Sequence, residues 1–302
     1  MIRGGAIGDF ILTLPAIAAL RRQFPEAHLE VLGYPHIVQL AITAGVVDCT
    51  QSIEARALAG FFARNGSLDE SLKDYFSEFD LIVSYLYDPD HIFQTNVRRC
   101  SPAQFIEGPH RPEEADGIHA SKIYMKPLER LAIFDADPVP RLELGGVRQR
   151  SFSGSLALHP GSGSETKNWP EEKWAQLLQL LVNSTQPALI LVGGEAEGER
   201  LHRLSGPWAP ARVRMAQSLP LPELAKRLAE CSGFIGHDSG ISHLAAALGL
   251  PSLLLWGNTS EETWRPPGEG VIVLRSPSGL NALSVADVWS AVMRTFNVRE
   301  IQ

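Results

Sequence analysis

Residues 236–249 read Gly-His-Asp-Ser-Gly-Ile-Ser-His-Leu-Ala-Ala-Ala-Leu-Gly, a polar turn that runs directly into a helical pattern. The apolar residues before this turn predict a short strand, and Asp238-Ser239 can cap the helix that follows. Backbone N–H groups at a helix start suit an anion such as a phosphate. An ordinary capped helix has the same pattern, so this stretch alone leaves both interpretations open. The apolar face of the helix recurs at i, i+3, i+4 and i+7, namely Ile241, Leu244, Ala245 and Leu248.

The size and composition are those of a globular protein with more than one domain. The chain has 302 residues, of which 44% are hydrophobic and 20% charged, and this is long enough for two domains with separate cores. No apolar run approaches the roughly 20 residues that span a bilayer. Residues 1–5 also lack the features of a secretory signal. We therefore expect neither a membrane-spanning helix nor secretion.

Charge and cysteine usage narrow the functional class. A net charge of −7 disfavours a dedicated nucleic-acid binder, because affinity for a phosphate backbone needs concentrated positive charge. Cys49, Cys100 and Cys231 are far apart and have no metal-ligand spacing. Such cysteines are typical of reduced thiols in the cytoplasm. A few local lysines could still hold one small anionic ligand.

The first half of the chain alternates strand-like and helix-like segments. Only three residues precede the glycine loop at 4–9, so the innermost strand is either very short or begins upstream of Met1. We expect the next helix to start after Pro15 and to end before Pro25. Segment 88–114 has four prolines and many charges, which predicts an irregular loop that is either mobile or faces an acceptor substrate. The other expected strands are 29–33 and 80–87, and the expected helices are 36–44, 68–78 and 119–134, the last interrupted at Pro127.

The second half repeats the alternation after a glycine- and serine-rich linker candidate at 145–154. Strands are expected at 155–159, 188–192, 212–215, 251–256 and 270–274, with helices at 171–182, 198–204, 221–228 and 284–297. Alternating strands and helices predict parallel sheets. We therefore predict two α/β domains, residues 1–150 and 151–302, with a cleft between them.

The first glycine loop points to proton transfer rather than cofactor binding. Residues 4–9 read Gly-Gly-Ala-Ile-Gly-Asp, which is neither the dinucleotide fingerprint Gly-x-Gly-x-x-Gly nor a lysine-bearing P-loop. Asp9 would repel a phosphate but could accept a proton from a substrate hydroxyl. A helix-capping role for Asp9 is the alternative. We place Gly5, Gly8 and Thr13 with Asp9 on the acceptor side, where the substrate that carries this hydroxyl would bind.

The loop at 159–170 is a candidate diphosphate cradle. It follows a predicted strand and offers glycines, hydroxyls and one lysine before a helix, including Ser164, Thr166 and Lys167. Glu195 and Glu197 follow the next strand and should lie at the same sheet edge, where a carboxylate could bind ribose hydroxyls. Both glutamates could equally be solvated residues favoured by a helix dipole.

Metal, hydrolase and cofactor sites are not predicted. Asp88-Pro89-Asp90 has the Asp-x-Asp form of some metal sites, but no further acidic or histidine cluster would complete an octahedral set. The histidines form no His-x-x-x-His or Cys/His pattern. The nucleophile elbow Gly-x-Ser-x-Gly is also absent.

Three separated segments together resemble glycosyltransferase family 9, the heptosyltransferases of lipopolysaccharide assembly. The first is Gly8-Asp9 with Thr13-Leu14-Pro15, and the second is His159-Pro160-Gly161 with Lys167-x-Trp169-Pro170. The third is Asp238-Ser239-Gly240 with His243-Leu244-Ala245-Ala246-Ala247-Leu248-Gly249-x-Pro251, continued by Gly257-x-Thr259. The segments occur in order over nearly the whole chain.

The resemblance implies the GT-B fold, in which two Rossmann-like α/β domains face a cleft, with the final helix at 284–297 packing back on the first domain. It implies that Asp9 is the catalytic base, Lys167 the phosphate-binding lysine and Glu197 approximately the ribose ligand. Donor binding would also involve Ser164, Thr166, Asp238, Ser239, Gly240 and His243. The implied activity is inverting, metal-independent heptose transfer from an ADP-activated donor to a lipopolysaccharide-core or similar glycan.

The implied enzyme is cytoplasmic, with a peripheral contact at the inner membrane and no obligate protein partner. Two alternatives use the same phosphate loops. A GT-B nucleotide-sugar epimerase would not need Asp9 as a transfer base, and a non-catalytic nucleotide-sugar binding protein would bind the donor without turnover.

Overall fold

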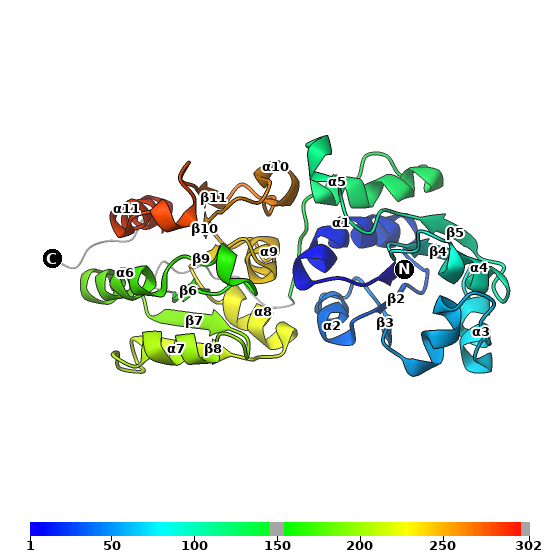
Figure 1. Cartoon of the computed structure of the whole chain (residues 1–302), viewed down its shortest axis with the longest axis horizontal. Helices are drawn as coiled ribbons and strands as arrows, with labels where there is room; N and C mark the ends of the chain where they lie inside the picture. The colour runs from blue at the N-terminus through cyan, green and yellow to red at the C-terminus, as the bar shows by residue number, and fades with distance from the viewer. Residues whose placement is uncertain (145–153, 297–302) are drawn as a thin grey trace. The chain divides into compact units, whose positions relative to one another are not determined.

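The computed structural model describes residues 1–144 and 154–296, which form two compact units, Met1–Pro138 and Val139–Gln302 (Figure 1). The expected boundary at residue 150 and almost all of the linker candidate lie outside the described residues. Leu142, which we had assigned to the first domain, belongs to the second unit. Its side chain is fully buried and its N–H donates to the carbonyl of Ala247 at 2.9 Å.

The first unit is a five-stranded parallel sheet of order β3-β2-β1-β4-β5. The central strand β1 has only two residues, Ile2 and Arg3, as the short stretch before the glycine loop led us to expect. The strands are β1 (Ile2–Arg3), β2 (Glu30–Gly33), β3 (Cys49–Ser52), β4 (Leu81–Ser84) and β5 (Gln104–Glu107). The helices are α1 (Ile7–Gln23), α2 (Pro35–Thr43), α3 (Glu70–Ser77), α4 (Ile92–Arg98) and α5 (Ala120–Met125). Short 3₁₀ helices span Arg56–Phe62, Glu114–Asp116 and Lys126–Leu131.

An aromatic cluster fills the core below one face of this sheet. Phe61 lies 5.0 Å from Phe76 and 6.1 Å from Phe93 between ring centroids, and all three rings are buried. They pack against Ile2, Leu32, Ile82 and Phe105 of the sheet. Helix α1 packs against α5 and α2.

The start of α1 differs from our expectation. The helix begins at Ile7 and contains Pro15, so Asp9 lies in its first turn and not at the tip of a loop. The carboxylate Oδ2 of Asp9 accepts a hydrogen bond from the Ala6 N–H at 3.1 Å, which satisfies one of the free donors at the helix start. Pro15 is buried within the helix, so tertiary packing outweighs the usual cost of an interior proline.

Segment 88–114 is also more regular than expected, because it contains α4 and β5. The Asp88 carboxylate accepts hydrogen bonds from the N–H groups of Phe93 at 3.1 Å and Gln94 at 2.9 Å. Asp88 therefore caps a helix, and its carboxylate oxygens are engaged with the backbone.

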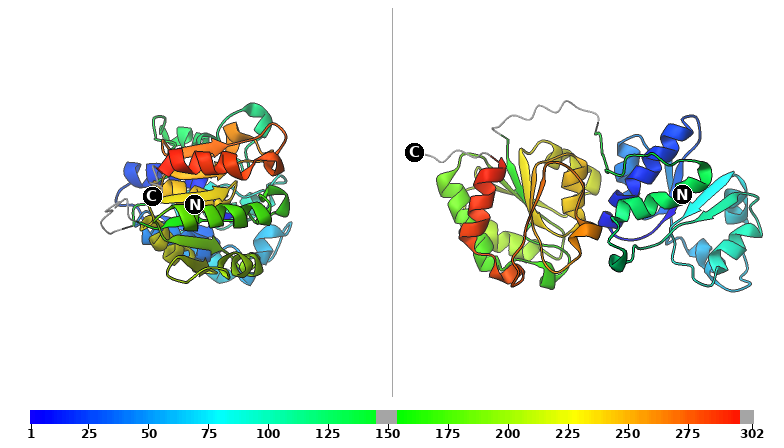
Figure 2. Two further views of the ribbon diagram at one scale, coloured as in Figure 1. Left: turned by 90° about the vertical axis from the view of Figure 1, so that its left-hand side faces the viewer. Right: turned by 90° about the horizontal axis from the view of Figure 1, so that it is seen from above.

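The second unit is a six-stranded parallel sheet of order β11-β10-β9-β6-β7-β8. In Figure 2, α6, α7 and α11 cover one face and α8 and α9 the other. The strands are β6 (Leu156–Leu158), β7 (Leu189–Gly193), β8 (Val213–Gln217), β9 (Gly233–His237), β10 (Ser252–Leu255) and β11 (Val271–Leu274). The helices are α6 (Glu171–Ser184), α7 (Gly198–Ser205), α8 (Leu221–Ala229), α9 (Gly240–Ala247), α10 (Glu261–Trp264) and α11 (Val285–Phe296).

Helical periodicity located the core helices of this unit correctly. Trp174, Leu177, Leu178 and Leu181 of α6 are all buried in the core. The last helix, α11, packs against α6 and β10 of its own unit. Its packing onto the first domain stays a prediction.

Candidate active site

The polar loops of the second unit gather at the carboxyl edge of its sheet. Lys167 follows β6, Glu197 follows β7, Asp238 follows β9 and Thr259 follows β10. The chain leaves β6 toward β7 and β8 on one side, and it returns through β9 to β10 and β11 on the other. This reversal is a topological switch point between β6 and β9, and doubly wound sheets bind ligands in the crevice outside the carboxyl ends of the strands at such a point. The shared sheet edge expected for Lys167, Glu197 and Asp238 is confirmed.

Lys167 is held at this crevice by an ion pair. Its Nζ lies 2.6 Å from Oδ2 of Asp238, and the hydroxyl of Thr259 donates to the same oxygen at 2.7 Å. The Asp238 side chain is only 10% exposed, whereas that of Lys167 is 41% exposed. An ammonium group has three donors, so Lys167 can keep Asp238 and still offer N–H groups to a ligand.

The start of α9 lies beside this ion pair. Ser239 is the N-cap, and its Oγ accepts from the Ser242 N–H at 3.3 Å. Gly240 is the first helical residue, and His243 is buried in the following turn. The remaining first-turn N–H groups and the helix dipole favour negative charge at this end.

The other predicted donor residues differ in their exposure. Ser164 and Thr166 are exposed, and their hydroxyls lie 3.0 Å apart.

Glu197 is half-buried, and its Oε2 accepts from the Gly194 N–H at 2.9 Å. Gly161 lies so close to Glu197 that a β-carbon there would be 2.3 Å from the glutamate Cγ. Glu197 therefore packs against the Lys167 loop, whereas Glu195 is exposed.

Two buried histidines, His159 and His237, support this edge, and neither was among the predicted site residues. His237 contacts both Trp169 and Gly161, and Nδ1 of His159 lies 3.2 Å from the Ser239 hydroxyl. Burial lowers the pKa of His237 to about 3 and that of His159 to about 4. Both rings are therefore neutral near pH 7. Their position at strand ends before polar loops was the signal available in the sequence.

Asp9 lies at the carboxyl edge of the first sheet, next to the end of β1. Its Oδ1 accepts from the Tyr124 hydroxyl at 3.4 Å and lies 3.7 Å from Nη2 of Arg3. Arg3 is buried and stacks 4.3 Å from the centroid of the Tyr124 ring. The Asp9 side chain is 28% exposed. The carboxylate is thus oriented by three protein groups while remaining open to solvent.

The three residues expected on the acceptor side, Gly5, Gly8 and Thr13, mainly determine the backbone conformation around Asp9. Gly5 has φ of +101°, and a β-carbon there would lie 3.0 Å from Asp9 Oδ2, so glycine suits this position on both counts. Gly8 lies in the first turn of α1. Thr13 is buried, and its hydroxyl donates to the Asp9 carbonyl at 2.8 Å. Arg3 and Tyr124 were not anticipated, because they approach Asp9 from β1 and α5.

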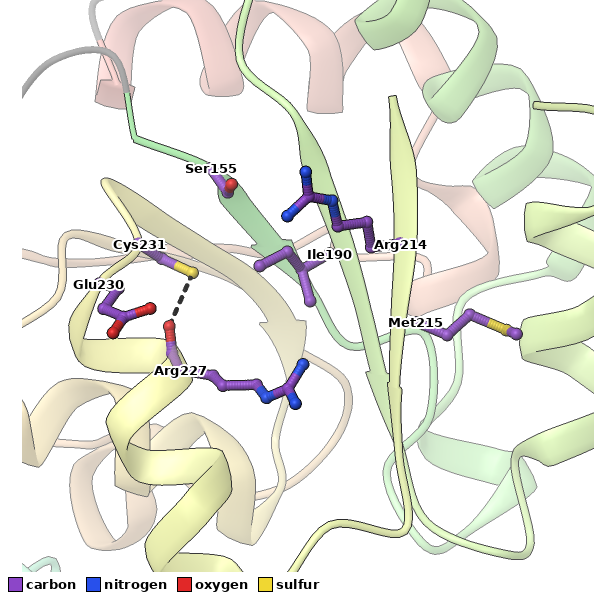
Figure 3. Close-up of a pocket in the computed structure, with 7 residues that line it drawn as sticks. All are labelled: Ser155, Ile190, Arg214, Met215, Arg227, Glu230 and Cys231. Atoms are coloured by element: carbon purple, nitrogen blue, oxygen red, sulfur yellow. Dashed lines mark hydrogen bonds between the residues drawn. The ribbon is translucent and has the colours of Figure 1, made fainter. Parts of the chain in front are cut away.

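A cavity of about 190 Å³ lies elsewhere in the second unit (Figure 3). Its lining includes Ser155, Ile190, Arg214, Arg227 and Cys231. Ser155 precedes β6, and Cys231 precedes β9, so the cavity is near the amino edge of the sheet. It is separate from the Lys167 crevice, and it contains none of the predicted site residues.

Across residues 1–144 and 154–296, no group of three or more His, Cys, Asp and Glu side chains is arranged to hold a metal ion. Within the same described ranges, no helix is long and apolar enough to cross a bilayer.

Two doubly wound parallel-sheet units are the architecture expected of the GT-B fold. A family model described as glycosyltransferase family 9 (heptosyltransferase) matches residues 146–285. Lipopolysaccharide heptosyltransferase 1 of Pseudomonas aeruginosa is 34% identical over 300 residues, covering 86% of this chain and 78% of the relative. Lipopolysaccharide heptosyltransferase 3 of Escherichia coli is 22% identical over 299 residues, covering 88% and 85%. The chain belongs to glycosyltransferase family 9.

Solved structures agree on the fold. Heptosyltransferase WaaC of E. coli with ADP superposes with a TM-score of 0.76 at 20% identity, covering 97% of this chain and 98% of that one. E. coli ADP-heptose lps heptosyltransferase II gives a TM-score of 0.77 at 16% identity, covering 98% of both chains. The solved structures confirm the predicted fold, and the sequence relatives confirm the predicted family and glycosyltransferase activity.

The neutral histidines predict a loss of stability in mild acid. The folded-state pKa values of His237 and His159 lie below the ordinary value of 6.5, so the unfolded chain takes up protons first as the pH falls. The full contribution of the two histidines to the free energy of unfolding is present above pH ~6.5. Below that pH it declines by roughly 1 kcal/mol per pH unit for each histidine. Urea unfolding between pH ~7 and ~5 measures this decline. His159→Asn should flatten it, whereas His202→Asn, exposed on α7, should not. Equal slopes in both variants would contradict the assignment.

Proposed function

We propose that this chain is an inverting glycosyltransferase that moves a heptose from ADP-heptose to a hydroxyl of a lipopolysaccharide-core or similar glycan. The observation that carries the proposal is the Lys167 ammonium, held by Asp238 at the crevice beside β6 and β9. Relatives named as lipopolysaccharide heptosyltransferases and a related structure solved with ADP support the acceptor and donor classes.

The donor diphosphate binds between Lys167 and the start of α9. Lys167 provides a point charge, and the first-turn N–H groups beyond Ser239 provide donors. Glu197, which packs against Gly161, accepts hydrogen bonds from the ribose hydroxyls. Lys167 and the helix dipole supply the positive charge that the departing diphosphate requires. An obligatory metal is therefore not part of the proposal.

Asp9 acts as the general base for the acceptor. Its carboxylate takes the proton of the acceptor hydroxyl as that oxygen bonds to the anomeric carbon and the bond from this carbon to the diphosphate breaks. A single displacement of this kind inverts the anomeric configuration. Arg3 and Tyr124 hold the carboxylate in one orientation, which favours a productive approach of the hydroxyl.

We place the reaction in the cytoplasm, with a peripheral contact at the inner membrane. The cysteines of the described residues are free thiols, which fits a reducing compartment. A lipopolysaccharide-type acceptor is membrane-linked, so the enzyme must reach the membrane surface. The proposal requires no protein partner.

Asp9→Asn should lose about 10² to 10⁴-fold in turnover while binding ADP normally. The amide oxygen can still accept the Ala6 N–H but cannot take up a proton at neutral pH. Heptose transfer from ADP-heptose to a lipopolysaccharide-core acceptor measures turnover, and calorimetry measures ADP affinity. Asp69→Asn is the matched control, because Asp69 also caps a helix, α3, and is not one of the groups that contact the Asp9 carboxylate. Wild-type turnover in Asp9→Asn would refute the base assignment.

Among nucleoside diphosphates, ADP is expected to bind most tightly, because a related structure is solved with this nucleotide. Calorimetric titration of the wild-type protein with ADP, UDP, GDP and CDP tests the base preference. Tighter binding of UDP would assign a different donor, and no binding of any of the four would exclude a nucleoside diphosphate donor.

A further inference from the structure

His237 hydrogen-bonds both ends of the loop that carries Lys167. We infer that His237 is a positioning residue, which fixes this loop in its phosphate-binding shape before the donor arrives. The inference rests on the proposed donor role of Lys167. It assigns a function to a buried side chain that does not itself reach the ligand.

The loop leaves β6, passes through residues 161–169 and enters α6, while His237 ends the neighbouring strand β9. The Trp169 N–H donates to Nε2 of His237 at 2.9 Å, and Nδ1 of His237 lies 3.2 Å from the Gly161 carbonyl. A carbonyl only accepts, so Nδ1 must carry the hydrogen and Nε2 must be the acceptor. One neutral imidazole tautomer therefore satisfies both ends of the loop.

The surrounding side chains keep this ring in place. His237 is fully buried, and its ring stands edge-on to Trp174 at 5.4 Å between centroids. Its backbone carbonyl accepts from the Ser242 hydroxyl. Trp169, at the far end of the loop, is anchored in turn through its indole N–H to the Leu283 carbonyl at 3.1 Å. Rotation of the imidazole would break hydrogen bonds that buried groups cannot replace with water.

The middle of the loop is held separately and leaves Lys167 available. Arg200 of α7 donates to the Glu165 carboxylate at 2.8 and 3.0 Å and to the Pro160 carbonyl at 3.4 Å. Glu165 begins the short 3₁₀ helix Glu165–Lys167. The loop is thus fixed at its ends by His237 and braced at its centre by Arg200, and the Lys167 side chain remains 41% exposed.

When the loop is already ordered before binding, the ligand does not have to supply the free energy of ordering it. Ordering a side chain or short loop on binding costs enough to weaken affinity by about two- to tenfold. Loss of the His237 contacts should therefore weaken binding of the phosphates by about this factor. The nucleoside part of the ligand should be unaffected, because the loop carries the phosphate-binding lysine.

Three substitutions separate the two contacts. His237→Asn places an amide near the Nδ1 position and can keep the Gly161 contact, whereas His237→Gln reaches the Nε2 position and can keep the Trp169 contact. His237→Leu removes both. Lys167→Ala removes the phosphate ligand itself, and His202→Asn is the control for a histidine exposed on α7.

The measurement is calorimetric titration of each full-length variant with ADP and, by displacement, with adenosine. We expect ADP affinity to fall about two- to tenfold in His237→Leu, which loses both contacts, by less in His237→Asn and His237→Gln, and most in Lys167→Ala. Adenosine affinity should stay unchanged in all of them. If His237→Leu does not fold, the comparison rests on the Asn and Gln variants.

Two outcomes would overturn the inference while leaving the donor site intact. One is wild-type ADP affinity in the His237 variants alongside a loss in Lys167→Ala. The other is an equal loss of ADP and adenosine affinity, which would show a general structural role. Unchanged ADP affinity in Lys167→Ala would instead refute the proposed donor site, and the inference with it.

Discussion

The order of strands in each parallel sheet is the constraint on which the candidate site depends. Both sheets start from a central strand, β1 or β6, and extend in opposite directions from it. The loops and helices that follow the two central strands run to opposite sides of the sheet. The carboxyl ends of these strands, β1 and β4 or β6 and β9, therefore remain uncovered. Asp9 follows β1, and Lys167 follows β6. Topology therefore places both of these candidate residues at the carboxyl edge of their sheet.

Charge is arranged differently at the two edges. At the first, the buried guanidinium of Arg3 lies near the accessible carboxylate of Asp9. At the second, the partly exposed Lys167 lies beside the nearly buried carboxylate of Asp238. Each edge thus exposes one charged group and keeps its counter-charge inside. The histidines behind the second edge are neutral, so His237 contacts both ends of the lysine loop through hydrogen bonds without adding a charge there.

Much of this arrangement could be predicted from the sequence, because apolar periodicity reports burial directly. It located α6 and the strands of the second unit, and the glycine-rich loops marked both sheet edges. It failed where distant residues decide the outcome. Pro15 lies inside a helix because the surrounding fold buries it, and segment 88–114 is ordered by contacts such as those of Asp88. Arg3 and Tyr124 reach Asp9 from separate elements, which no local pattern reveals.

A crystal structure of the full chain with ADP would examine the donor site most directly. The diphosphate should lie beside β6 and β9, within hydrogen-bond distance of Lys167 Nζ and at the start of α9. Lys167 Nζ should contact a phosphate oxygen, whether or not it also keeps its contact with Asp238. Diphosphate bound instead in the cavity near Arg214 and Arg227, with Lys167 contacting Asp238 alone, would contradict this account of how the enzyme holds its donor.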